Sequence, residues 1–108
     1  MGSTKSQIFS TEQNQIADFA KAIAHPARVA IIQQLLKLNA CICGDLVEEI
    51  GLSQSTVSQH LKELKHAGII KGKIDGPKVC YCLDYDVCRT AISFFTNLLS
   101  NPGKNDCC

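Results

Sequence analysis

Cysteine is the residue type in this sequence with the most chemistry to offer. The chain holds seven cysteines, at positions 41, 43, 80, 82, 88, 107 and 108. Two pairs have the form Cys-x-Cys, and a third pair is the adjacent Cys107-Cys108. The count is odd and the members of each pair are too close for ordinary bridging within the pair, so a disulfide framework is disfavoured. Thiols at this density indicate soft-metal, metalloid or redox chemistry.

Size and composition predict one globular domain. The chain has 108 residues, is 45% hydrophobic and carries a net charge of +1. A core of this size often gains stability when the domain pairs with a second copy. No apolar run is long enough to span a membrane, and the first residues do not form a secretory signal. The expected location is therefore the cytoplasm, without a membrane partner, where the thiols would stay reduced.

The hydrophobic pattern begins with two helices. Ser10 can cap the first of them, with Gln13 at the capping-box position. The stretch "HPARVAIIQQLLKL" predicts a second helix with Pro26 in its first turn. Its apolar spacing indicates a buried stripe of Val29, Ile32, Leu35 and Leu36.

The second half predicts a helix-turn-helix followed by a hairpin. A brief helix over "GDLVEEIG" and a longer one from Ser53 to Gly68 are joined by "GLS". Two strands follow around the turn at 75–78, and a last helix starts at Asp84 or Asp86. The expected fold is mainly α with a small β-hairpin, a winged helix-turn-helix over residues 10–100. It would lie between a flexible start (1–9) and a flexible cysteine-containing tail (101–108).

The helix after Ser53 has one face that suits the edges of bases. On a helical wheel, Val57, Leu61 and Leu64 face the core. The opposite face is polar and has no carboxylate: Ser55, Ser58, Gln59, Lys62 and His66. Gln can pair with adenine, Ser with several bases, and Lys with guanine or phosphate, which suits a helix in a major groove.

Local charge supports the same interpretation. Residues 62–78 contain five lysines, at 62, 65, 71, 73 and 78, against Glu63 and Asp75. Such a patch attracts a phosphate backbone despite the near-neutral total charge. The alternative is an ordinary solvated surface. His60 lies beside the apolar stripe, and the wheel favours a packed, hydrogen-bonded histidine over a base reader.

The segments "AHPARVAIIQQLL", "GDLVEEIGLSQSTVSQHLKELKHAGII" and "DGPKVCYCLD" resemble the ArsR/SmtB winged-helix metalloregulatory repressors of the arsenic-sensing type. The resemblance covers roughly residues 16–100. It implies a homodimer through the first and last helices, operator DNA with dyad symmetry, and release by an effector. It also makes His60 a recognition position, which disagrees with the wheel. The candidate DNA contacts are Ser53, Gln54, Ser55, Thr56, Ser58, Gln59, His60, Lys62, Lys73 and Lys78.

Many members of that family sense soft ions through a Cys-x-Cys before the recognition motif. Here an extra Gly44 shifts the pair one residue upstream of its usual position. In winged helices the segment before the third helix often pairs with the second wing strand, which would put "ACIC" beside "VCYC". Side chains alternate along strands, so two to four thiols could converge there. The predicted metal ligands are Cys41, Cys43, Cys80 and Cys82, with Cys107 and Cys108 as further candidates.

These features predict a dimeric DNA-binding repressor that is released from its operator when thiolates bind arsenite or a related trivalent arsenical. Three thiolates suit trivalent arsenic, whereas four suit zinc or cadmium, which are the alternative ions. No permanent cofactor is expected. Two other functions stay open: a thiol-based redox-sensing repressor with cross-strand disulfides, and a repressor domain with a structural zinc site. The chain lacks Cys-x-x-Cys and a nucleotide-binding loop, so an enzyme is not expected.

Overall fold

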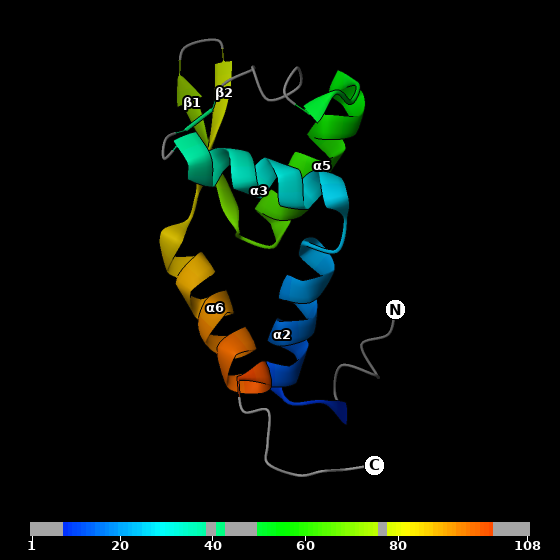
Figure 1. Ribbon diagram of the computed structural model, residues 1–108, viewed down its shortest axis with the longest axis vertical. Coiled ribbons are helices and arrows are strands. Elements are labelled where there is room, and N and C mark those ends of the chain that lie inside the picture. The colour runs from blue at the N-terminus through cyan, green and yellow to red at the C-terminus, as the bar shows by residue number, and fades with distance from the viewer. Residues whose placement is uncertain (1–7, 39–40, 43–49, 76–77, 101–108) are drawn as a thin grey trace.

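The fold is known from a computed structural model, which describes residues 8–38, 41–42, 50–75 and 78–100 (Figure 1). Within these ranges it has four helices and one two-stranded antiparallel sheet. The elements in chain order are α2 (Thr11–Ala22), α3 (Pro26–Leu38), α5 (Gln54–His66), β1 (Ile70–Asp75), β2 (Lys78–Leu83) and α6 (Tyr85–Leu99). Mainly helical structure with one hairpin is therefore confirmed. The short helix expected over "GDLVEEIG", the two ends of the chain and residues 76–77 of the turn fall largely or wholly outside the described residues.

The helix starts follow the capping residues. Ser10 Oγ accepts a hydrogen bond from the Gln13 backbone N–H at 3.0 Å, and Gln13 Oε1 accepts one from the Ser10 N–H at 2.9 Å. This reciprocal pair is the predicted capping box. Pro26 is the first residue of α3, where its missing N–H has no helical partner to lose. Asp84 caps α6, because its carboxylate accepts from the Val87 N–H at 3.3 Å.

The buried face of α3 differs from the predicted one. Ala27, Ile31 and Leu35 are buried, whereas Val29 and Leu36 are 41% and 56% exposed. At about 100° per residue, Val29 and Leu36 lie roughly 140–160° around the helix from Ile31. The helix contacts α5 and β2. The face of α3 that packs against them carries Ala27, Ile31 and Leu35, which are spaced four residues apart. The predicted stripe was wrong at Val29 and Leu36.

The end of α5 turns the chain into the hairpin. Gly68 has a φ of +84°, a left-handed conformation that glycine adopts without steric cost. Its N–H bonds to Lys65 O at 2.9 Å, and the next N–H, of Ile69, bonds to Leu64 O at 3.1 Å. This is the Schellman pattern, in which Leu64 and Ile69 meet as buried apolar neighbours of the cap.

The core lies where α3, α5 and the hairpin meet. In Figure 1, α3 crosses the middle of the molecule, the hairpin projects from one end, and α2 and α6 extend from the other. The most deeply buried side chains of the core come from α3, α5 and the hairpin: Ile31, Leu35, Val57, Leu64 and Ile70. α2 and α6 contact each other, with the rings of Phe19 and Phe94 centred 6.1 Å apart. None of the described helices is both long and apolar enough to cross a membrane.

Candidate nucleic-acid interface and thiol pair

The first turn of α5 is rich in hydroxyl groups. Ser53 is the N-cap, and its Oγ accepts from the Thr56 N–H at 3.3 Å. The same Oγ lies 2.8 Å from Thr56 Oγ1 and 3.3 Å from Ser55 Oγ. The first turn holds no acidic residue, so nothing there opposes the partial positive charge of the helix N-terminus. This end of α5 can therefore approach an anion.

One face of α5 is exposed and the other is buried, as the helical wheel predicts. Val57, Leu61 and Leu64 are buried in the core. The exposed polar side chains are those of Gln54, Ser55, Thr56, Ser58, Gln59, Lys62, Glu63, Lys65 and His66. They offer amide, hydroxyl and ammonium donors, and Glu63 is the one carboxylate among them. The face has the chemistry to contact base edges and phosphates.

Lysines extend this surface onto the hairpin. Lys71 and Lys73 of β1 are exposed, and α5 contacts β1. The Lys65 side chain passes over Gly72, where an added Cβ would lie 3.3 Å from Lys65 Nζ. The basic surface is thus formed by Lys62 and Lys65 of α5 together with Lys71 and Lys73. The side chain of Lys78 is not among those that the structure describes.

His60 is held inside the protein. Its side chain is only 8% exposed, its Nδ1 accepts from Arg28 Nε at 3.1 Å, and its ring centre lies 4.3 Å from that of His25. Burial, with smaller contributions from His25 and Arg28, lowers the pKa of His60 below its ordinary value, and Glu63 opposes this. His60 is therefore packed and hydrogen-bonded, as the helical wheel predicts. It does not lie on the exposed face of α5, where the resemblance implies a DNA contact.

Arg28 is the partner of His60 that reading the sequence missed. It lies on α3, 32 positions before His60 in the chain. Neither the apolar period nor any motif spacing connects the two. The contact arises only when α3 and α5 pack against each other.

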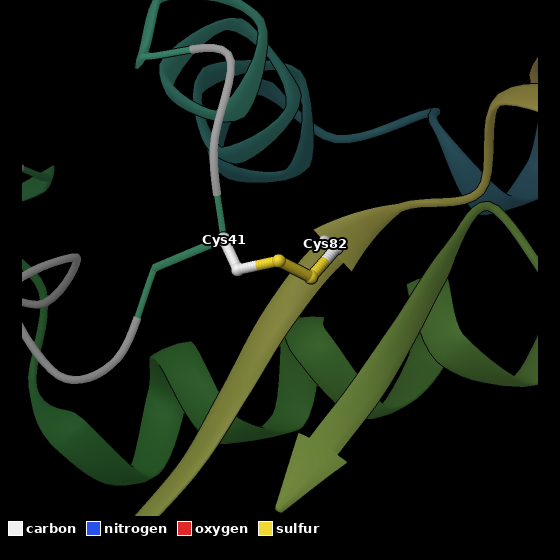
Figure 2. The surroundings of a disulfide bond; sticks show 2 residues. All are labelled: Cys41 and Cys82. Atoms are coloured by element: carbon white, nitrogen blue, oxygen red, sulfur yellow. A yellow bond between two sulfur atoms is a disulfide. The ribbon is translucent and has the colours of Figure 1, made fainter. Parts of the chain in front are cut away.

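The two Cys-x-Cys segments meet across a strand pairing. Ile42 and Tyr81 exchange two backbone hydrogen bonds of 2.9 Å each. In an antiparallel pair the next residues face each other without hydrogen bonds, at a Cα separation near 4.5 Å. Cys41 and Cys82 occupy that position, with Cα atoms 4.4 Å apart, and their sulfur atoms form a disulfide (Figure 2). The expected approach of the two segments is confirmed for this pair.

The other cysteines differ in state. Cys80 is buried and also disulfide-bonded, so the expectation of reduced thiols is wrong for Cys41, Cys80 and Cys82 in this structure. The reason is tertiary: strand pairing brings distant sulfurs into bonding distance. Cys88 is the free thiol of the described residues, and burial beside Asp84 raises its pKa. Cys43, Cys107 and Cys108 lie outside the described residues.

No metal site is formed by the described residues. Within them, no three His, Cys, Asp or Glu side chains are grouped so that they could hold an ion. In the reduced state Cys41 and Cys82 would offer two neighbouring sulfur ligands. Two thiolates satisfy neither the three-sulfur preference of trivalent arsenic nor the four-ligand preference of zinc.

Ser53 caps α5, α5 has an exposed polar face, and the hairpin of β1 and β2 follows it directly in the chain. This arrangement is that of a winged helix-turn-helix protein. Residues 25–71 match the family described as "Bacterial regulatory protein, arsR family". The repressor SdpR of Bacillus subtilis is 35% identical over 86 residues, which cover 80% of this chain and 93% of SdpR. The chain therefore belongs to the ArsR family of bacterial regulatory proteins. The relatives it matches are transcriptional regulators, and the chain is not an enzyme.

Other relatives extend the comparison. The "HTH-type transcriptional repressor SmtB" of Mycobacterium tuberculosis is 41% identical over 66 residues, which cover 61% of this chain and 48% of SmtB. The chain thus spans about half the length of that relative. HlyU from Vibrio cholerae has a similar structure, with a TM-score of 0.66 and 26% identity over 86% of this chain and all of HlyU. A structure described as reduced HlyU matches with a TM-score of 0.63 and 28% identity, over 81% of this chain and 90% of that one.

Proposed function

We propose that this chain is a transcriptional repressor that binds double-stranded DNA with α5 in the major groove. The observation that carries this proposal is the group of exposed amide and hydroxyl side chains on α5, in particular Ser55, Ser58 and Gln59. The basic surface on α5 and β1 supplies attraction to phosphates on either side of the groove. SdpR and SmtB are named repressors, which supports repression of transcription rather than its activation.

We propose a homodimer that is built on the first and last described helices. α2 and α6 line an apolar groove of about 310 Å³, together with residues of α3. Ile92 and Leu98 of α6 are 62% and 59% exposed, which is costly for apolar side chains unless a partner covers them. A dimer would place two α5 helices for two half-sites, which lie about 34–36 Å apart on DNA.

We propose that oxidation of Cys41 and Cys82 controls DNA binding. The support is the disulfide between them and the strand pairing that holds their Cα atoms 4.4 Å apart. A peroxide would oxidise one thiol to a sulfenic acid with release of water. The second thiol would then attack that sulfur, forming the disulfide and releasing a second water. Two thiols and one hydrogen peroxide thus yield one disulfide and two waters.

The resting state decides the direction of the response. A repressor has to occupy its operator before the signal arrives, and in a reducing compartment the resting form is the dithiol. We therefore assign DNA binding to the reduced form and release to the oxidised form. Ile42, next to Cys41, is buried in the same cluster as Val57 and Leu61. A bond at Cys41 therefore acts close to the buried face of α5.

Capture of a trivalent arsenical is the second candidate for the effector. The same pair of facing cysteines supports it, because two neighbouring thiolates can chelate a soft centre. The arsenical would need a third ligand from the remaining cysteines, whereas the disulfide needs no further residue. The redox proposal is therefore the one that the geometry favours.

The test is a DNA-binding titration with each effector. A duplex is first selected from a random-sequence library by the protein in the presence of reductant. Its affinity is then measured with reductant, after peroxide, after re-reduction, and with arsenite added to the reduced protein. We expect peroxide to weaken binding at least tenfold and re-reduction to restore it. Arsenite release with no peroxide effect would transfer the proposal to the arsenical.

Serine variants identify the sulfurs involved. Cys41→Ser and Cys82→Ser should bind the selected duplex as the reduced wild type does and lose the response to peroxide. Cys88→Ser is the matched control, because Cys88 is a free, half-buried thiol outside the pair. It should keep the full response. A normal response in both Cys41→Ser and Cys82→Ser would exclude this disulfide as the switch.

A further inference from the structure

Three helices are joined at one point by Arg28. Its Nη1 donates to Ala22 O, near the end of α2, at 3.1 Å, and its Nε donates to His60 Nδ1 on α5 at 3.1 Å. The Arg28 side chain itself comes from α3. It therefore connects α5, the helix that we propose to enter DNA, with α2 and α3.

His25 completes this arrangement from the turn between α2 and α3. Its Nδ1 accepts the Ala27 N–H at 3.0 Å, which caps the start of α3. Its ring is tilted by 50° to that of His60, with the ring centres 4.3 Å apart. The His60 ring is thus held on one side by a guanidinium and on another by an imidazole.

The hydrogen bond from Arg28 defines the protonation state of His60. Because Nδ1 accepts, it carries no proton, and the neutral ring has its proton on Nε2. A second proton would turn Nδ1 into a donor that faces another donor. It would also place a positive charge beside Arg28. The bond can persist only while His60 is neutral.

We propose that the Arg28–His60 hydrogen bond positions α5 for DNA binding, and that a proton taken up by His60 releases it. This inference rests on the proposed role of α5 in DNA recognition. Arg28 is a positioning residue, and His60 acts from inside the protein rather than on the DNA. Acid would therefore weaken binding through a buried group, whereas protonation of exposed histidines would strengthen it by adding positive charge.

The surroundings of His60 favour this response. Burial, His25 and Arg28 all disfavour the charged ring, and Glu63 on the same helix is the one group that favours it. A cavity of about 780 Å³ borders the cluster and gives water access to His25 and Arg28. Its other titratable lining residues are Asp18 and Lys21 of α2, and Glu63 and His66 of α5.

The experiment compares pH profiles of DNA affinity. The probe is the duplex selected from the random library, at constant salt and with reductant so that the cysteines do not contribute. Between pH 7.5 and pH 5.5 we expect the wild-type dissociation constant to rise about five- to tenfold. His60→Asn keeps an acceptor near the position of Nδ1 but cannot take up a proton there, so its profile should be flat or inverted. A wild-type profile that matches that of His60→Asn would overturn the inference.

Two further variants make the result specific. His66→Asn is the control, because His66 is an exposed histidine on the same helix. It should show an acid loss at least as large as that of the wild type. Arg28→Met removes the donor, so binding should weaken at pH 7.5 and should lose its acid dependence; an unchanged acid loss would contradict the proposal. If His60→Asn does not fold, Arg28→Met tests the inference instead: loss of the acid dependence supports it, and an unchanged acid loss contradicts it.

Failure of this inference can be separated from failure of the proposed function. If selection enriches no duplex, the proposed DNA binding is wrong and the inference that rests on it falls with it. If a duplex is enriched and bound at pH 7.5 but affinity shows no His60-dependent acid loss, only the inference fails. NMR titration of the His60 ring checks that its protonation coincides with the change in affinity.

Discussion

Cys41 and Cys82 lie opposite each other on backbone segments that pair through a β-bridge, although 41 positions separate them in the sequence. The pairing is centred on Ile42 and Tyr81, whose two hydrogen bonds make Cys41 and Cys82 a non-hydrogen-bonded pair. The disulfide connects the segment after α3 to the last part of β2, just before the cap of α6. Breaking or forming this bond therefore acts on one segment that precedes α5 in the chain and on one that follows it.

Reduction should lower the stability of the fold. Closing a loop of 41 positions removes chain entropy from the unfolded state, worth about 4 kcal/mol in the entropic model and typically about 2–4 kcal/mol in practice. Urea unfolding with and without reductant measures the difference. Cys82→Ser lacks this cross-link and should show a smaller effect of reductant than the wild type, since the disulfide at Cys80 remains in it. Equal stability of the oxidised and reduced wild type would show that the cross-link does not constrain the chain.

Gln59→Ala should weaken DNA binding while leaving the fold intact. The side chain is exposed on the proposed DNA-facing side of α5, and loss of a base contact typically costs about 1–3 kcal/mol. Binding to the selected duplex is compared with thermal unfolding of the free protein. Gln33→Ala is the matched control, since Gln33 is exposed on α3. Unchanged affinity of Gln59→Ala would remove Gln59 from the set that reads bases.

Gly68→Ala should destabilise the protein by about 1–2 kcal/mol, because a side chain is strained at a φ of +84°. Thermal or urea unfolding gives the value. Gly72→Ala is the comparison: Gly72 is not in that conformation. Its new Cβ would meet the flexible end of Lys65 and, at an ordinary van der Waals distance of 3.6 Å, Val79 Cγ1. Gly72→Ala should therefore change stability less. A larger loss for Gly72→Ala than for Gly68→Ala would contradict this reasoning.

Stability should fall with acid, and His60 should contribute to the fall. Its pKa is lowered in the folded protein from the ordinary 6.5, so the unfolded chain takes up this proton at a higher pH than the folded one. The contribution of His60 is therefore fully present well above pH 6.5. It is lost as the pH falls from there through the lowered pKa of the folded state. Urea unfolding at several pH values should show a smaller acid loss in His60→Asn than in the wild type. An equal loss in both would exclude His60 as the cause.

Local signals in the sequence were sufficient for the helix starts and for the exposed face of α5. Ser10 with Gln13, Pro26 and Ser53 each act within one helical turn, so their roles can be read from neighbouring residues. For the last helix the sequence left Asp84 and Asp86 open, and the structure shows Asp84 as the cap. The same holds for the apolar period that buries Val57, Leu61 and Leu64, and for the two strands around the turn at 75–78. The family resemblance is confirmed by the match of residues 25–71 to the arsR family and by the similarity to SdpR.

Only the tertiary structure decided which face of α3 is buried, what His60 contacts, and which cysteines meet. Apolar spacing alone predicted Leu35 correctly but also placed Val29 and Leu36 in the buried stripe, whereas packing against α5 and β2 buries Ile31 beside Leu35. Arg28 and His60 are 32 positions apart, and Cys41 and Cys82 are 41 apart. Contacts of that separation depend on how helices and strands pack, and no short-range pattern of residues specifies them.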